Sequence, residues 1–391
     1  MLESKIALFE SVKCVLNKTS FNNEITDDKH FYILARENGL SGMIFNALDK
    51  TLISEEVYLR FKKDFFLFNS QHEKQVVLIK KMEQLLNENK IEHIFLKGTS
   101  LKAYYPESYM RSMGDIDLLV KKEKMKEVFQ VFKANKISLI AKSSAHDNYE
   151  DNQGLSIEVH PEISREIQTK YDDISNHTWE ESINVYESRY QLNPEYELCY
   201  LLVHMIKHFY SSGVGLRSVL DIGLFVRENL EIIDEKELRR QLDQYQLNQF
   251  FLNILYLNKV YFDINPLPKM LDDFIMKEEV YNSLTDYILT SGVHGHGISF
   301  NRFIGRLGSN QLQNKSRLSL IFSIVFPGYQ AMKGMYPWLK YLPFLLPLTW
   351  MIRWFKIMIL KFKISIKKIR KLFTKKSEID EISNLYKEIG L

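Results

Sequence analysis

Hydrophobic residues recur at helical spacing along most of the chain, and strand-like runs are confined to one stretch near its middle. Residues 1 to about 70 hold apolar patches separated by polar turns, which predict two to four helices. A helical stripe follows over Gln75–Asn87. From about residue 175 the strand signals fade, and stripes such as the one from Leu198 to Phe209 predict mostly helices up to about residue 290.

Four segments between residues 91 and 160 have the composition of β-strands. The first turns directly into a helix at Gly98, and an amphipathic helix over Lys122–Asn135 joins the second to the third. The polar stretch Asp147–Asp151 predicts a turn with solvated carboxylates. The predicted strands are Ile91–Leu96, Asp115–Val120, Ile137–Ala141 and Leu155–His160.

Composition narrows the class of protein. With 391 residues, of which 45% are hydrophobic, the chain can form two or three packed units, which excludes a disordered or collagen-like protein. Its two cysteines, Cys14 and Cys199, lie far apart, which excludes a disulfide framework and a cysteine-rich zinc module. Because Met1–Cys14 mixes charged with apolar residues, it predicts an amphipathic helix and not a secretory signal, so we expect a cytoplasmic protein.

The charge is distributed unevenly along the chain. The stretch Ile288–Ser377 has sixteen Lys or Arg and no Asp or Glu, so the rest of the chain is acidic. Two charge-free runs, Leu318–Met332 and Tyr341–Ile352, contain proline and are shorter than a membrane-spanning helix. Met351–Lys376 predicts a basic amphipathic helix, which either packs on the acidic body, lies on an anionic membrane at its inner face, or contacts nucleic acid without sequence specificity.

Two aspartates at the start of a predicted strand are the strongest chemical signal. Because side chains alternate along a strand, Asp115 and Asp117 point the same way. Two carboxylates so close repel one another unless a cation lies between them, and oxygen ligands of this kind suit Mg²⁺. Upstream, Gly98 stands where a strand becomes a helix, and Thr99 and Ser100 add hydroxyl donors, as at an anion-binding turn.

Together these motifs resemble the nucleotidyltransferase superfamily with the DNA polymerase beta-like fold. The matching residues are Leu96-Lys97-Gly98-Thr99, followed after a loop by Asp115-Ile116-Asp117. Within that superfamily the chain is similar to a bacterial family of uncharacterised nucleotidyltransferases, and this similarity extends to Leu201–Gly223 and Phe326–Arg353. The resemblance implies an α+β fold, in which a mixed-sheet core is flanked by mainly α-helical N-terminal and C-terminal regions.

The family also implies a third carboxylate on a neighbouring strand, and Glu158 is the acid that lies between apolar residues on a later predicted strand. By resemblance, Asp115, Asp117 and Glu158 hold two Mg²⁺ ions, with Mn²⁺ as the alternative, and act as the catalytic residues. The expected substrates are an NTP, with ATP as the expected nucleotide, and an acceptor hydroxyl, and pyrophosphate is the leaving group. The expected nucleotide-binding residues are Lys97, Gly98, Thr99, Ser100, Arg111, Ser112 and Arg217.

The chain divides by pattern into four predicted regions. They are an N-terminal helical region (1–70), the nucleotidyltransferase core (71–170), a helical domain (171–290) and a basic C-terminal helical region (291–391). The helical domain is expected to close over the nucleotide, with Arg217 and His208 reaching its phosphates or base. His204 and His208 have a spacing compatible with zinc, but no third ligand accompanies them, so core or surface histidines are favoured.

Two other functions remain open. The fold is also found in proteins that bind a nucleotide or a partner without catalysis, and the same site suits a kinase-like phosphoryl transfer. The absence of a G-x-x-x-x-G-K-[ST] or G-x-G-x-x-G segment excludes P-loop kinases and Rossmann dehydrogenases.

Overall fold

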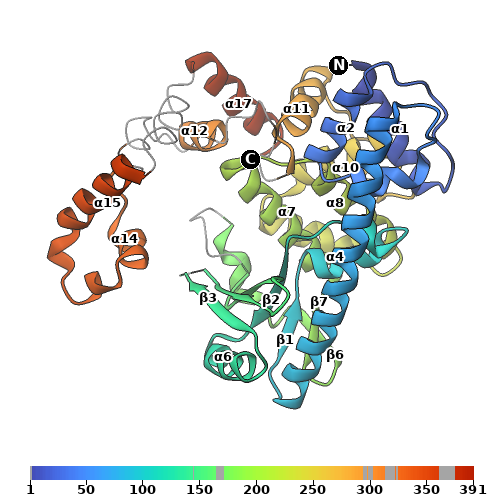
Figure 1. The fold of residues 1–391 in the computed structure, drawn as a ribbon. Helices are drawn as coiled ribbons and strands as arrows, with labels where there is room; N and C mark the ends of the chain where they lie inside the picture. Colours follow the sequence, from blue (N-terminus) through green and yellow to red (C-terminus); the bar gives the residue numbers. More distant parts are fainter. Residues whose placement is uncertain are drawn as a thin grey trace.

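The computed structural model describes residues 2–143, 145–163, 171–293, 297, 303–312, 322, 325–360 and 375–391. A mixed β-sheet occupies one end of the molecule and a group of helices the other, and the long helix α4 (Glu55–Glu88) runs beside both (Figure 1). This arrangement confirms the α+β class. Because residues 361–374 lie outside the described part of the chain, the predicted basic helix is described only at its two ends.

The sheet has seven strands in the order β3-β4-β5-β2-β1-β7-β6. Two neighbouring pairs are parallel, β2 with β5 and β1 with β7, and the others are antiparallel. The strands are β1 (His93–Phe95), β2 (Asp115–Val120), β3 (Ser138–Lys142), β4 (Asp147–Glu150), β5 (Ser156–His160), β6 (Ser182–Tyr186) and β7 (Arg189–Leu192).

Alternation along β2 gives the sheet two different faces. Ile116, Leu118 and Val120 point to one side, where they form a hydrophobic core with the C-terminal half of α4 and with α6 (Met125–Ala134). The opposite face belongs to the larger core of the helical end. The intervening residues of β2 therefore turn toward the helices that follow the sheet in sequence.

The helices have the following bounds. Near the N-terminus lie α1 (Leu2–Leu16), α2 (Asp28–Glu37) and α3 (Ser41–Ile44), and α5 (Gly98–Leu101) follows β1. The central group is α7 (Pro194–Ser211), α8 (Leu216–Asn229), α9 (Glu235–Gln244), α10 (Asn248–Phe262) and α11 (Glu278–Ser291). The C-terminal part holds α12 (Phe303–Leu312), α14 (Tyr329–Met335), α15 (Leu346–Leu360) and α17 (Lys376–Glu388), and 3-10 turns include Lys102–Tyr104, Asp172–His177, Pro337–Lys340 and Pro343–Leu345.

Helix α7 connects the sheet to the helical core. It begins with Pro194, whose fixed φ suits the first helical turn, and most of its side chains are buried. It packs against α8, α9 and α12. Within the described residues, no helix combines the length and hydrophobicity required to cross a bilayer.

Three strands differ from the sequence prediction. The polar segment Asp147–Glu150 is the strand β4 and not a turn, because it pairs with β3 on one side and β5 on the other. Asp147 is accordingly buried and not solvated. The hairpin of β6 and β7 was not predicted, and it extends the sheet beyond residue 170 through the pairing of β7 with β1. The four region boundaries remain predictions.

Candidate active site

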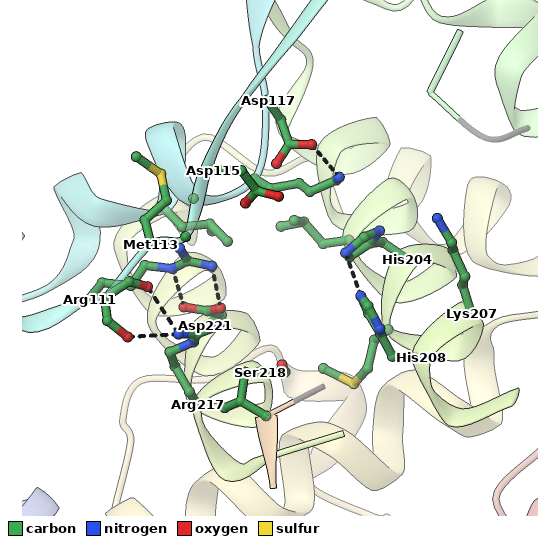
Figure 2. Close-up of a pocket in the computed structure, with 18 of the residues that line it drawn as sticks. Arg111, Met113, Asp115, Asp117, His204, Lys207, His208, Arg217, Ser218 and Asp221 are labelled. Carbon is green, nitrogen blue, oxygen red and sulfur yellow. Dashed lines mark hydrogen bonds and ion pairs between the residues drawn. The ribbon is translucent and has the colours of Figure 1, made fainter. Parts of the chain in front are cut away.

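Strand register brings the three predicted carboxylates to one face of the sheet. In the parallel pair of β2 and β5, Asp117 lies opposite Glu158, and Asp115 lies opposite Ser156. Since side chains two residues apart share a face, Asp115, Asp117 and Glu158 all point toward α7. Asp115 and Asp117 stand at one edge of the cleft between sheet and helices (Figure 2).

The cleft has a volume of about 630 Å³ and is lined by three parts of the chain. Its walls are β2 with β5, the loop before β2, and the helices α7 and α8. Eight of the ten predicted site residues line it, namely Lys97, Gly98, Arg111, Ser112, Asp115, Asp117, Glu158 and Arg217.

Thr99 and Ser100 do not line this cleft. The Thr99 hydroxyl lies 3.7 Å from the Met113 sulfur, and the Ser100 hydroxyl donates to Glu197 at 2.7 Å. Helix α5 is only four residues long, and the Thr99 N–H donates internally to the carbonyl of Leu96. The turn therefore contributes to the cleft through Lys97 and Gly98 and not through its hydroxyls.

Asp117 is buried and has two positively charged or polar partners. Lys97 Nζ lies 2.6 Å from its Oδ1, and His160 Nε2 lies 2.9 Å from the same oxygen. Burial alone would raise the pKa of Asp117, but Lys97 and His160 outweigh burial and hold that pKa well below its usual range. Asp117 is thus ionised whenever the protein is folded near neutral pH.

Asp115 has the opposite electrostatic environment. Burial, followed by the negative charges of Asp117 and Glu158, raises the pKa of Asp115 to about 6, although Lys97 opposes the shift. The very different pKa values of these two carboxylates indicate a surplus of negative charge at the beginning of β2. A bound cation would relieve that surplus.

The backbone around Lys97 and Gly98 is tightly constrained. Lys97 has a φ of 48°, in the left-handed region that non-glycine residues rarely occupy. A Cβ on Gly98 would lie 2.6 Å from the Met113 sulfur and 2.7 Å from Arg111 Nη1. A side chain at position 98 would therefore displace the Met113 and Arg111 side chains, while the unusual backbone conformation belongs to Lys97.

A buried ion pair stands beside the carboxylates. Arg111 donates from Nε and Nη2 to the two carboxylate oxygens of Asp221, each at 2.8 Å, and Tyr105 donates to Oδ1 of the same group at 2.8 Å. Arg217, one helical turn before Asp221 on α8, donates to the carbonyl and hydroxyl oxygens of Ser112 at 3.0 and 2.8 Å. The sequence predicted that Arg111 binds phosphate, whereas in the structure Arg111 forms an ion pair with Asp221.

Helix α7 supplies the wall opposite the strands, where Lys207 lies with His204 and His208 (Figure 2). The two histidine Nε2 atoms are 2.9 Å apart. Sequence analysis favoured core or surface positions for these histidines and did not select Lys207. Lys207 could have been found from sequence, because it lies three residues after His204 and one before His208, which places it beside the histidines on the helix.

The donor set of the site fits a divalent cation. Carboxylates are the ligands that Mg²⁺ and Mn²⁺ use in proteins, and here three of them share one face. Among the described residues, however, the group whose ligand atoms all lie within 4.8 Å of one another is His146, Glu158 and His160. Asp115 and Asp117 are not part of this group, and Asp117 is bonded to Lys97 and to His160.

Glu197, the buried partner of Ser100, is expected to make the stability of the protein depend on pH. Burial raises the pKa of Glu197 to about 7 from an ordinary 4.5, although the Ser100 hydroxyl opposes the shift. Because the folded state retains a proton that the unfolded chain has released, this group reduces stability as the pH rises from about 4.5 to 7. Glu197→Gln is expected to raise the free energy of unfolding by about 2 kcal/mol at about pH 8, and by little at about pH 4.

Urea unfolding at the two pH values measures this difference. Glu231→Gln, at an exposed position, is the matched control and should change stability at neither pH. A Glu197→Gln variant that is less stable than wild type at both pH values would contradict the prediction.

Comparison with known proteins gives one match. A protein-family model described as an uncharacterised nucleotidyltransferase covers residues 25–263, which is more than half of the chain. No curated protein and no solved structure matches the chain.

Proposed function

Because the chain belongs to this family of uncharacterised nucleotidyltransferases, we propose that it transfers a nucleoside monophosphate from an NTP to an acceptor hydroxyl, with release of pyrophosphate. The observation that carries the proposal is the parallel register of β2 and β5, which sets Glu158 beside Asp117 with Asp115 on the same face. The expected nucleotide is ATP, and the acceptor is a small molecule, a saccharide, a peptide or a protein.

In this proposal Asp115, Asp117 and Glu158 hold Mg²⁺, with Mn²⁺ as the alternative. When bound, the metal neutralises the triphosphate and lowers the pKa of the acceptor hydroxyl. The raised pKa of Asp115 supports this assignment, because a carboxylate that resists ionisation beside two others gains from a neighbouring cation.

The opposite wall is suited to bind the triphosphate. His204, Lys207 and His208 of α7 and Arg217 of α8 line the cleft together with the carboxylates (Figure 2). The Nε of Arg217 is buried and has no hydrogen-bond partner among the described residues. An N–H donor in that position is expected to bind an anionic ligand, because a buried unpaired donor costs about 1–3 kcal/mol.

The proposed reaction forms a bond between the acceptor oxygen and the α-phosphorus and breaks the bond between that phosphorus and the bridging oxygen to the β-phosphorus. The electron pair leaves with pyrophosphate. The acceptor proton goes to Glu158, which is ionised near neutral pH: burial acts to raise its pKa, but His160 and His146 outweigh it and lower that pKa. Lys97 maintains the charge and orientation of Asp117.

The test uses purified full-length protein, Mg²⁺, a lysate as the source of acceptors, and each NTP labelled in turn at its α- or γ-phosphate. Nucleotidyl transfer places the α-label, and not the γ-label, on an acceptor and releases pyrophosphate. Transfer of the γ-label would instead establish a kinase-like reaction. NTP binding without transfer of either label would establish a non-catalytic module.

A further inference from the structure

Three side chains beside the sheet side of the cleft, His146, Glu158 and His160, form a mixed nitrogen and oxygen cluster, and Asp117 bonds to one of them. His160 Nε2 lies 2.9 Å from Asp117 Oδ1 and 3.5 Å from Glu158 Oε2. On the other side of the same carboxylate, His146 Nε2 lies 3.6 Å from Glu158 Oε1. The two imidazole rings are 5.1 Å apart.

These separations match those of atoms that share one metal ion. Two ligand atoms about 2.1 Å from an ion lie roughly 3.0 Å apart at right angles and roughly 3.4 Å apart at the tetrahedral angle. Glu158 lies 3.5 Å from His160 and 3.6 Å from His146, near this range, and the ligand atoms of the three residues all lie within 4.8 Å of one another.

Tertiary structure, and not sequence spacing, builds this cluster. His160 is the last residue of β5, and Glu158 precedes it by two residues on the same face. His146 comes from the turn between β3 and β4, and β4 lies beside β5 with Asp147 opposite Val159. Asp117 is contributed by β2 from the other side.

We propose that His146, Glu158 and His160 bind a divalent transition-metal ion such as Mn²⁺, Co²⁺ or Zn²⁺, while Asp117 orients His160. Imidazole nitrogens favour these ions over Mg²⁺, whose preferred ligands are oxygens. The site deepens the proposed function and rests on it in part, because Glu158 belongs to both. The nitrogen ligands give the protein a metal preference that a purely carboxylate site would lack.

The experiment is a titration of untagged, metal-free protein with Co²⁺, without nucleotide, followed by visible absorption and by calorimetry. Wild type is expected to bind Co²⁺ with absorption bands typical of nitrogen and oxygen ligation. His146→Gln is expected to weaken Co²⁺ binding by about 100-fold, since loss of even an outer partner of a metal site costs about 10- to 100-fold. His177→Gln is the control, because His177 is exposed and bonds to Glu180.

Three outcomes would overturn the site. They are the absence of Co²⁺ binding to wild type, equal Co²⁺ affinity in wild type and His146→Gln, and full displacement of Co²⁺ by an equal concentration of Mg²⁺. His160→Gln provides a second variant, and circular dichroism shows whether each variant folds. Because the readout is binding without nucleotide, its failure is distinguishable from a failure to transfer nucleotide.

An independent surface lies near the C-terminus. The α14–α15 segment, residues 325–357, stands at one side of the molecule, away from the sheet (Figure 1). Tyr341 is 78% exposed and Phe344 is 72% exposed. Other exposed large apolar side chains there are Met335, Leu348, Met351 and Phe355.

Basic residues interleave with these apolar side chains. Lys333, Lys340, Arg353 and Lys356 belong to the segment, and no Asp or Glu occurs anywhere from 288 to 377. Exposed aromatic and aliphatic groups beside an unbroken positive charge are the two signals that bind a protein to the surface of an anionic bilayer. We infer that the α14–α15 segment binds anionic phospholipid at the membrane surface.

Co-sedimentation of the full chain with phosphatidylcholine vesicles, with and without phosphatidylglycerol, tests the surface. Wild type is expected to pellet only with phosphatidylglycerol, and less at high salt. The double variant Phe344→Ser, Phe355→Ser is expected to lose most of this binding, whereas Ile275→Ser, at an 86% exposed position elsewhere, should retain it. Equal pelleting of both variants, or a concentration-dependent dimer that the double variant abolishes, would overturn the assignment.

Discussion

Replacing Asp115 with Asn is expected to abolish nucleotidyl transfer and at the same time to make the folded protein more stable. The change removes a carboxylate proposed to hold the metal, so we expect a loss of activity on the order of 10³-fold or more. The same carboxylate has a pKa raised to about 6 by burial and by Asp117 and Glu158. Because the unfolded chain ionises near the ordinary pKa of 3.8 while the folded carboxyl stays protonated up to about pH 6, this group lowers the free energy of unfolding progressively between those two pH values. The loss persists above pH 6, and Asn removes it.

Asp117→Asn is expected to abolish transfer with the opposite effect on stability. Asp117 is buried against Lys97 and His160, and the neutral amide would leave the buried Lys97 ammonium without its anionic partner. The cost of such a change is on the order of 3 kcal/mol. Both variants should thus lose nucleotidyl transfer, but Asp115→Asn should raise the free energy of unfolding and Asp117→Asn should lower it.

Thermal unfolding and α-label transfer, measured on the same samples, check both expectations. At about pH 8 the gain for Asp115→Asn is on the order of 1 kcal/mol, a rise of roughly 2 °C, and it should become small below about pH 3, where the carboxyl is mostly protonated in both states. Asp272→Asn, at an exposed position outside the cleft, is the charge-matched control. Retained transfer in either site variant would refute the metal assignment, and a less stable Asp115→Asn would refute its electrostatics.

The buried ion pair of Arg111 and Asp221 is expected to be a large contributor to the free energy of unfolding. Asp221→Asn is expected to destabilise the protein by about 3–5 kcal/mol, because it leaves a buried guanidinium without a counter-charge. Both side chains are only 8% exposed, and their two hydrogen bonds are each 2.8 Å long. Tyr105 would lose its acceptor at the same site.

A double variant separates charge from packing. Arg111→Met with Asp221→Leu replaces the ion pair with apolar side chains, and we expect it to recover much of the stability that Asp221→Asn loses. Urea unfolding gives the free energies, and Arg227→Met, which removes a partly exposed arginine elsewhere on α8, is the control. If Asp221→Asn unfolds at the same urea concentration as wild type, the pair is not an important source of stability.

Local sequence was sufficient for features that depend on neighbouring residues. The period of two along Asp115–Val120 placed both aspartates on one face. The period of 3.6 predicted helices over Gln75–Asn87, which is the last part of α4, and over the segment that became α7. Glu158 was selected as an acid between apolar residues, and the register sets it beside Asp117. The family match confirms the nucleotidyltransferase resemblance.

Local sequence failed where a segment depends on its partners. Asp147–Glu150 has a polar composition typical of a turn, yet it is a strand because β3 and β5 satisfy its backbone on both sides. The short strands β6 and β7 were missed for the same reason, because β7 pairs with β1, a strand almost a hundred residues earlier in the chain. Propensity is a weak guide when the neighbouring strand decides the structure.

The sequence by itself indicated the residues that we propose to carry the chemistry: the aspartate pair, Glu158, and the glycine turn that precedes them. Only the tertiary structure decided what each of them faces. It paired Arg111 with Asp221 across 110 positions, joined Lys97 and His160 to Asp117, and set His146 beside Glu158. The physical reason is that periodicity reports one element at a time, whereas charge pairing and metal coordination depend on distances between elements that meet only after the chain has folded.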